Sequence, residues 1–315
     1  MKIYFGELMI SLLLDLLIPL FAIFIAVFSK RLDINKNFYI KLFFGLFVIS
    51  ISSAIVSYVI PSPILGLVGS FYMWLAFGFV LLHSSKVLGN KKTLIFFIIA
   101  YLFGFTFEAI GVKYGGIFGM PYYYQNIPTF FFGLVPISTP ISWCIIIYFS
   151  YTLTNLFLFG FGGKKPRKTD DRAYFWVMIV ILSAIGGFVA LNLDMILDPV
   201  AVAPQVGGWV WSGGGPYFGI PIGNFIGWFM VSAVAILIFR YYESISSKTN
   251  PKYELNIPLN SYIVLLYFIY FLENAVRALT LGKMEYILIG ATTMMPFVLV
   301  SLLVLLLLRK NENHC

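Results

Sequence analysis

Charge is scarce in this sequence of 315 residues. Only 11% of the residues are charged and 60% are apolar, whereas about a quarter of the residues in a soluble globular domain are charged. That shortage excludes an ordinary water-soluble domain. Segments of alternating polarity, which a membrane barrel needs, are also missing: the stretches 8–28 and 285–308 are almost wholly apolar and have about the 20 residues that a membrane-spanning helix requires. We therefore expect an all-α fold, a polytopic integral membrane helical bundle.

Cysteine and histidine are scarce as well. Cys144 lies inside an apolar stretch and Cys315 is the last residue, so we expect no disulfide between them. His83 and His314 do not join a set with metal-ligand spacing, and we expect neither a metal nor a cofactor. The net charge of +8 would suit nucleic acid only if Lys and Arg gathered on one face beside stacking aromatic residues. They are distributed by loop instead, so membrane lipid is the expected partner and nucleic acid is not.

Apolar windows predict nine transmembrane spans. Acidic Glu7 precedes the first window and no small-residue cleavage site follows it, which is typical of a retained first helix. The windows are 8–28, 39–60, 64–82, 93–110, 140–161, 174–193, 222–242, 260–280 and 285–308.

Basic residues divide unevenly between the two sides of this arrangement. Seventeen of the 21 Lys and Arg fall on one side, and the other side has only Lys2, Lys113, Arg277 and Lys283. Cytoplasmic loops carry the excess of basic residues in membrane proteins. The pattern predicts a multi-pass protein of the cell membrane, with its N-terminus outside and its C-terminus in the cytoplasm.

Two outer connections, 111–139 and 194–221, are long, nearly uncharged, and rich in Gly, Pro and aromatic residues. Amphipathic rings are stable at the membrane interface, so an aromatic belt explains part of this composition. The remaining rings would line a pocket for an apolar ligand, because such pockets combine apolar walls with a few polar groups.

An internal repeat relates these two connections. Residues 132–143 align with 218–228 with one gap, and each segment opens a span from the outer side. Upstream, Glu108 precedes Trp143 by 35 positions and Asp194 precedes Trp228 by 34.

Both hairpins run in the same direction, so they would be parallel repeats related by an axis along the membrane normal. The repeat units would be 93–161 and 174–242 within a single integral membrane domain, 1–315. Chance similarity between Gly- and Pro-rich apolar strings is the alternative. If the duplication is real, Glu108 and Asp194 lie at matching depths and face one another across the axis.

Eleven of the 13 acidic residues fall into two groups, and Glu7 and Glu285 are expected at the membrane interface. Those among Lys and Arg in cytoplasmic segments are expected on the solvated surface; they are Asp33, Asp170, Asp171, Glu243, Glu254 and Glu312. Others lie inside spans or at their outer ends, where an ionisable group is costly and indicates a function; they are Asp15, Glu108, Asp194, Asp198 and Glu273. Glu273 has Arg277 one helical turn on, which favours an ion pair. For Asp15 we expect a hydrogen bond to a neighbouring helix.

Asp194 and Asp198 are four residues apart and therefore share one helix face. Two close carboxylates do not ionise together easily, so one is expected to stay protonated near neutral pH, as a general acid must. The structural alternative is that Asp198 closes a helix ahead of Pro199.

Two segments resemble a known family. They are Phe107-Glu108-Ala109-Ile110-Gly111-Val112, with the Tyr- and Gly-rich loop through Gly119 and Tyr122, and Asn192-Leu193-Asp194-Met195 with Asp198-Pro199-Val200-Ala201. The chain is similar over roughly 65–305 to the carotenoid biosynthesis protein family of membrane carotenoid hydratases. The resemblance implies an integral membrane enzyme, without a cofactor, that adds water to the terminal isoprenoid double bond of a carotenoid.

The chemistry of that reaction suggests residues for each step. A buried carboxylic acid supplies the proton, and we expect this to be Asp194 or Glu108, with the other acting alongside Asp198 as general base. Aromatic faces stabilise a tertiary cation. The expected substrate-binding residues are Tyr114, Tyr122, Trp209, Trp211, Asn192 and Asn224, with Gln205 as a further candidate for holding the water.

Two other functions compete with hydration. Asn192, Asp194 and Asp198 faintly resemble an aspartate-rich magnesium motif of a membrane prenyltransferase, but the acids lie on the side with four basic residues, and pyrophosphate needs cations. A small-molecule transporter would also have intramembrane carboxylates and a repeat. Its expected polar residues in the cytoplasmic halves of the spans are largely missing from the sequence pattern.

Overall fold

The computed structural model describes residues 16–29, 31–125, 129, 133–160, 166, 170–246 and 257–312. By contacts, the chain divides into two compact units, Met1–Ile95 and Phe96–Cys315. The boundary falls inside helix α5 (Asn90–Tyr114). The expectation of a single membrane domain stays a prediction.

Eight helices in the described part of the chain are long and apolar enough to cross a membrane. They correspond to eight of the nine expected spans, which are thereby confirmed. The described part of the remaining span is the shorter apolar helix Leu16–Phe28, and the rest of that expected window, including Asp15, lies outside the described residues. The eight helices are Lys36–Val59, Pro63–Val87, Asn90–Tyr114, Ser138–Leu158, Arg172–Ala201, Ile222–Ser246, Leu259–Thr280 and Met284–Arg309.

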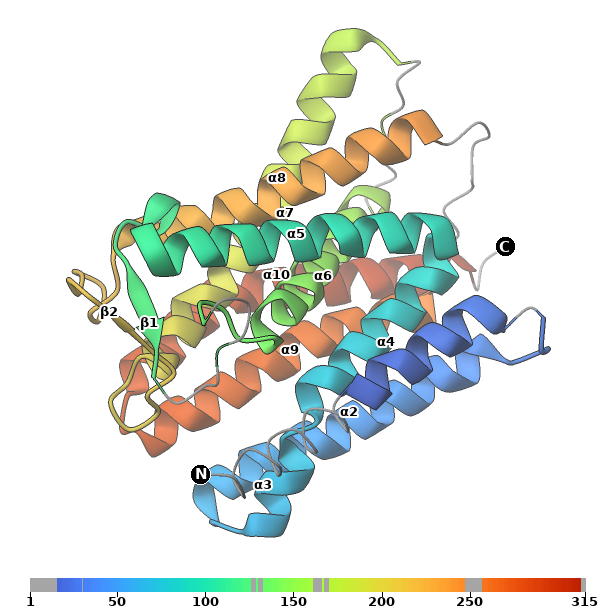
Figure 1. Cartoon of the computed structure of the whole chain (residues 1–315). Helices are drawn as coiled ribbons and strands as arrows, with labels where there is room; N and C mark the ends of the chain where they lie inside the picture. Colours follow the sequence, from blue (N-terminus) through green and yellow to red (C-terminus); the bar gives the residue numbers. More distant parts are fainter. Residues whose placement is uncertain are drawn as a thin grey trace. The chain divides into compact units, whose positions relative to one another are not determined.

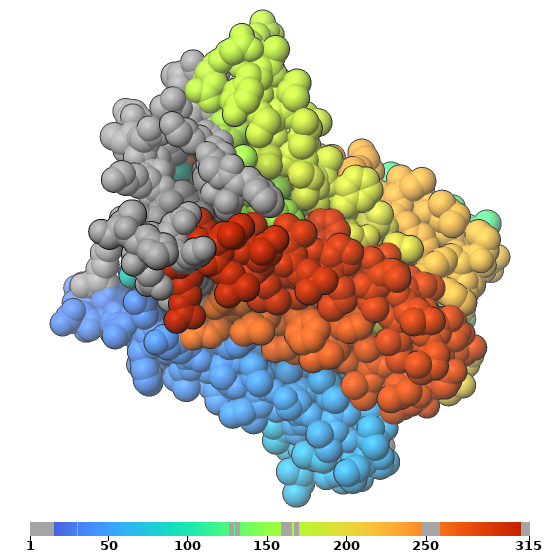
Figure 2. All heavy atoms as spheres, turned by 180° about the vertical axis from the view of Figure 1, so that it is seen from behind, coloured from blue at the N-terminus to red at the C-terminus, as the bar shows by residue number. Residues whose placement is uncertain are grey.

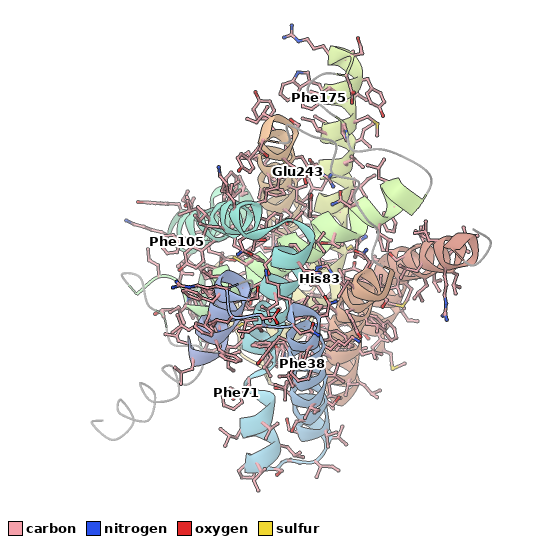
Figure 3. All side chains as sticks on the ribbon, turned by 90° about the vertical axis from the view of Figure 1, so that its right-hand side faces the viewer. Phe38, Phe71, His83, Phe105, Phe175 and Glu243 are labelled. Atoms are coloured by element: carbon pink, nitrogen blue, oxygen red, sulfur yellow. The ribbon has the colours of Figure 1, made fainter. Side chains whose placement is uncertain are left out.

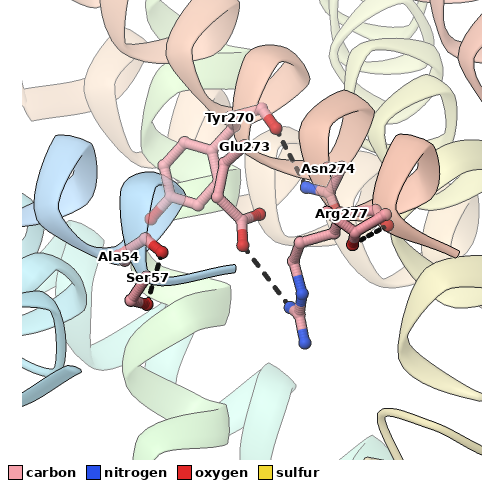
Figure 4. Close-up of polar contacts among 7 residues, drawn as sticks. Ala54, Ser57, Tyr270, Glu273, Asn274 and Arg277 are labelled. Atoms are coloured by element: carbon pink, nitrogen blue, oxygen red, sulfur yellow. Dashed lines mark hydrogen bonds and ion pairs between the residues drawn. The ribbon is translucent and has the colours of Figure 1, made fainter. Parts of the chain in front are cut away.

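In the first unit, the expected span 64–82 consists of two helices. α2 (Lys36–Val59) is followed by α3 (Pro63–Gly69) and α4 (Tyr72–Val87). Ser62 caps α3 and Pro63 occupies its first turn, where a missing N–H costs nothing. Ser50 and Ser53 of α2 donate to backbone carbonyls of α3. Ser57 donates instead within α2, to the carbonyl of Ala54, as Figure 4 shows.

The second unit contains the remaining elements, which Figure 1 labels. α7 packs against α8, α10, α6 and α9, and α10 also packs against α9. This places α7, with its two aspartates, among the other helices of the unit. After α5, the elements are η1 (Gly116–Phe118), β1 (Tyr122–Tyr124), α6 (Ser138–Gly160), α7 (Arg172–Ala201), β2 (Trp209–Trp211), α8 (Ile222–Ser246), α9 (Ile257–Thr280) and α10 (Met284–Glu312).

The two long connections pair with each other through β1 and β2. The strands are antiparallel, with Tyr122 opposite Trp211 and Tyr124 opposite Trp209. Figure 1 shows this ribbon at the end of α5. Pairing satisfies backbone groups that apolar loops could not leave exposed to lipid.

Two glycines bring the first connection close to α8. Gly223 and Gly227 lie one turn apart on α8, and η1 packs against this helix. A Cβ atom on Gly223 would come within 2.7 Å of the backbone nitrogen of Gly119. The absence of side chains at these positions therefore allows η1 to lie directly on α8.

Helix α7 continues past the expected end at residue 193. Pro199 lies inside the helix and lacks an N–H, so the carbonyl four residues earlier, on Met195, loses its helical donor. The Tyr217 hydroxyl donates to that carbonyl at 2.8 Å. Because the helix extends to Ala201, the alternative in which Asp198 closes a helix ahead of Pro199 is wrong.

Apolar side chains cover the outside of α10. Leu288, Leu299 and Leu306 are each more than 60% exposed, and their spacing places them on one helix face. Figure 2 shows α10, in red, on the surface beside α9 in orange. Such a face is stable against lipid tails, and with the eight apolar helices it makes this a multi-pass membrane protein.

Candidate functional site

Glu108, in the last two turns of α5, is buried and surrounded by hydrogen-bond donors. Trp143 Nε1, from α6, donates to Oε1 at 2.8 Å. The hydroxyls of Tyr124, at 2.9 Å, and of Tyr122 both donate to Oε2. Three donors offset part of the cost of burying a carboxylate, and each of them favours the ionised form of Glu108.

The two tyrosines remain phenols at neutral pH. Burial raises the pKa of Tyr122 and of Tyr124 well above the ordinary value, and the neighbouring Glu108 raises each pKa further. Thr139 Oγ1 donates to the Tyr124 hydroxyl at 3.3 Å. Both phenols therefore keep the protons that they donate to Glu108.

Asp194 and Asp198 form a second buried acidic group on α7. Their exposed fractions are 0% and 1%. Nδ2 of Asn224 donates to Oδ2 of Asp194 at 2.8 Å and to Oδ2 of Asp198 at 2.7 Å. One amide nitrogen thus bridges the two carboxyl groups, and Trp209 is a further partner of Asp198. Oδ1 of Asp194 is buried and has no hydrogen-bond partner among the described residues.

The two acidic groups belong to one site. Tyr122 and Tyr124, which donate to Glu108, lie on β1 opposite Trp211 and Trp209 of β2. Trp209 is in turn a hydrogen-bond partner of Asp198, so the strand pair connects the two acidic groups. The site therefore combines three carboxyl groups from two helices.

Aromatic rings surround these carboxyl groups in pairs. The ring centroids are 4.5 Å apart for Tyr122 and Trp211, and 6.2 Å apart for Tyr124 and Trp209. Across the strand pair, these contacts join the first connection to the second. Nε1 of Trp211 is buried and has no partner in the described part of the chain, so this site contains an indole donor that another molecule can use.

Several contacts join positions that the proposed repeat makes equivalent. Trp143 and Trp228 are 85 positions apart and have ring centroids separated by 4.5 Å. Asn155 and Arg240 are also 85 positions apart, and Arg240 donates to Asn155 at 2.9 Å. Parallel repeats around an axis along the helices would bring equivalent residues together at more than one depth. The duplication itself stays a prediction.

The structure brings together most of the residues predicted for the site. Asn192 lies two positions before Asp194 and hence about 200° around the helix from it, so its side chain belongs to another face of α7. Tyr114 and Gln205 are exposed, and neither is in the buried cluster. The expected residues that do gather are Glu108, Asp194, Asp198, Tyr122, Trp209, Trp211 and Asn224.

Sequence reasoning missed the donors of Glu108. In the sequence, Trp143 is only a marker of the repeat, and nothing relates Tyr124 to Glu108. The equal spacing from each acid to its tryptophan was the available signal. It indicates a recurring position, but it does not show that the indole points at the carboxyl group.

A second buried polar group lies at the opposite ends of α6 and α8. Glu243, expected on the solvated surface, is only 7% exposed and accepts a hydrogen bond from Tyr151 at 2.8 Å. Arg240 lies 4.8 Å from the centroid of the Tyr151 ring. Figure 3 labels Glu243 on α8. The surface prediction for Glu243 is wrong, because a charge near the end of a helix can be buried when neighbouring helices supply its partners.

The expected ion pair between Glu273 and Arg277 is confirmed. Their side chains are 3.4 Å apart, and Glu273 is almost fully buried. Figure 4 shows this pair on α9. Its partner accounts for Glu273 without a catalytic role.

In the described ranges, no group of three or more His, Cys, Asp or Glu residues is placed to hold a metal ion.

These features define a multi-pass membrane protein with buried carboxyl groups beneath paired aromatic connections. The chain belongs to the carotenoid biosynthesis protein family, whose model matches residues 68–298. It is 27% identical over 140 residues to bisanhydrobacterioruberin hydratase from Haloarcula japonica, a match that covers 44% of this chain and 42% of that protein. The match thus spans less than half of the relative's length. No solved structure is significantly similar to the chain.

Proposed function

We propose that this protein is a hydratase that adds water to the terminal isoprenoid double bond of an acyclic carotenoid end group and forms a tertiary alcohol. The family supports a carotenoid substrate, and the name of the distant relative supports hydration. The observation that carries the proposal is the combination of three buried carboxyl groups with paired aromatic rings from both connections.

Alkene hydration needs a proton donor that is positioned next to a carbon atom. Carbon is a poor proton acceptor, so the acid must be held against the double bond in a site that excludes bulk water. Asp194, Asp198 and Glu108 are all buried. Either Asp194 or Glu108 would supply the proton, and the remaining carboxyl groups would receive the proton that water releases.

The intermediate of such a reaction is a tertiary carbocation. Faces of Tyr and Trp rings attract cations, and the site has Tyr122, Trp211, Tyr124 and Trp209 as ring pairs. A nearby carboxylate adds direct charge stabilisation. Apolar rings also fit the polyene itself, which offers little else to bind.

Water has to be held beside the cation. Asn224 fixes the two aspartates by one amide group, so it positions the acids. Within this site, the indole N–H of Trp211 and Oδ1 of Asp194 are buried polar atoms without partners among the described residues. We assign these two atoms to binding the water or the product hydroxyl.

Incubation with an anhydro-carotenoid tests the activity. Membranes containing the protein should convert the carotenoid to a product heavier by one water, while membranes lacking the protein should not. A product extended by an isoprenoid unit would instead favour a prenyltransferase. An unchanged carotenoid at equal protein levels would contradict hydration.

We also propose that the site faces the outer side of the membrane, as the distribution of basic residues predicts. Tags in 111–139 and 194–221 should then report the outside, and tags in 162–172 and at the C-terminus the cytoplasm. Reversed labelling would contradict this orientation and would place the acids where a cytosolic pyrophosphate substrate reaches them.

A transporter remains a second candidate because of one observation. Tyr151, Asn155, Arg240 and Glu243 are buried polar residues at the ends of α6 and α8 away from the acids, where the sequence pattern had shown few. A transporter would move a ligand across vesicles without altering it, whereas the hydratase changes its mass.

A further inference from the structure

The two acidic groups of the site have unequal hydrogen bonding. Glu108 accepts from three side-chain donors, which engage both of its oxygens. Asp194 and Asp198 share the single amide nitrogen of Asn224. Donors stabilise the ionised form of a carboxyl group, so the difference in donors separates the protonation states of the two groups.

Glu108 is poorly suited to carry the transferable proton. A proton on Oε2 would compete with the two phenols that donate to it, and a proton on Oε1 would share that oxygen with the indole of Trp143. Both tyrosines keep their protons, as their raised pKa values show. Glu108 is thus held as a fixed negative charge.

The aspartate pair has the opposite arrangement. One nitrogen donates to both residues, so their Oδ2 atoms lie within the sum of two hydrogen-bond lengths, and two buried carboxylates this close repel each other when both are ionised. Asp198 has Trp209 as an additional partner, whereas Oδ1 of Asp194 has none among the described residues. The pair therefore holds one proton, and Asp194 is the residue with fewer donors.

Resting on the proposed hydration, we propose that the Asp194–Asp198 pair performs both proton transfers, with Asp194 as donor, while Glu108 stays ionised throughout and stabilises the cation. In the first step the O–H bond of Asp194 breaks, and the π electrons of the alkene form a C–H bond at the less substituted carbon. A tertiary cation remains on the other carbon. In the second step the oxygen of water bonds to that carbon, and the resulting oxonium ion returns one proton to the aspartate pair. One water is consumed and the pair regains its single proton.

This division of roles predicts how the site binds a stable positive charge. An isoprenoid chain that ends in a dimethylammonium group imitates the cation, and the chain that ends in an isopropyl group is its neutral isostere. The probe requires no turnover. Binding of both molecules to the purified, lipid-reconstituted protein can be followed by the fluorescence of its tryptophans.

The wild type should prefer the ammonium probe over the isopropyl probe. Glu108→Gln should reduce this preference by at least about tenfold, because it removes a charge in a site of low polarity. Asp194→Asn should preserve the preference, because it replaces a neutral acid by a neutral amide. Glu108→Asp keeps the charge and serves as the matched variant, which should retain a measurable preference.

Equal ammonium preference in Glu108→Gln and the wild type would overturn the proposal. A tenfold loss in Asp194→Asn would overturn it as well, because Asp194 would then be ionised. Binding of the neutral isopropyl probe shows that a variant is folded, so a loss that is confined to the ammonium probe is an effect of charge. The probe-binding result is independent of the hydration assay. A protein that does not hydrate a carotenoid can still be tested for its preference for the ammonium probe.

Discussion

Glu108 and Asp194 end up in different surroundings although they occupy comparable places in the chain. Each lies near the end of a helix that leads into a long aromatic connection, on α5 and α7 respectively. Glu108 meets two phenols and an indole, whereas Asp194 meets another carboxyl group and one shared amide. The position of an acid along its helix therefore determines whether it reaches the site. The hydrogen-bond donors around it determine whether it is ionised or protonated there.

Removing the proton from the aspartate pair should have the largest effect. Asp194→Asn keeps the shape and one oxygen but has no acidic proton. General acid–base groups contribute about 10²- to 10⁴-fold, so the rate of hydration should decrease by a factor near the upper end of that range. The rate of product formation at equal membrane levels is the measurement, and near-normal activity would end the assignment.

Removing the fixed charge should have a smaller effect. Glu108→Gln preserves an oxygen for the donors but loses the negative charge beside the cation. Electrostatic groups aimed at a transition state contribute on the order of 10²-fold, which is the expected loss in the same assay. A rate equal to that of the wild type would mean that Glu108 does not face the reacting carbon.

Removing single hydrogen bonds to Glu108 tests whether its donors keep this carboxyl group ionised. Tyr122→Phe and Tyr124→Phe each remove one hydrogen bond to a charged group, worth about 1.5–3 kcal/mol, and should each slow hydration about tenfold. Tyr123→Phe is the matched control, because Tyr123 lies between them on β1 and is exposed. Equal rates for all three variants would show that the phenols do not act through Glu108.

The smallest effect is expected from removing the hydrogen bond that Tyr217 donates to the Met195 carbonyl on α7, the helix of both aspartates. Burial raises the pKa of Tyr217 to about 12, so this hydroxyl stays protonated and donates to Met195 at any ordinary pH. Tyr217→Phe leaves that carbonyl without its donor, at about 1–3 kcal/mol of stability. Thermal unfolding in lipid measures the loss, with exposed Tyr114→Phe as control. An unchanged unfolding temperature would mean that Pro199 needs no such compensation.

The spans and the acids were predictable from the sequence, and their partners were not. Apolar length reports a helix directly, and the cost of charge in a membrane singles out Glu108, Asp194 and Asp198. The pairing of β1 with β2 and the indole of Trp143 on Glu108 depend on which distant segments pack together. Glu243 was misjudged for the same reason: its neighbours in the sequence are polar, but its partner Tyr151 lies 92 positions away.

Hydration in water labelled with oxygen-18 tests the central claim most directly. The purified wild type in lipid, given an anhydro-carotenoid, should form a tertiary alcohol that carries one labelled oxygen, and Asp194→Asn should form almost none. A product whose oxygen is unlabelled, or labelled product formed equally by both proteins, would contradict water addition through the aspartate pair.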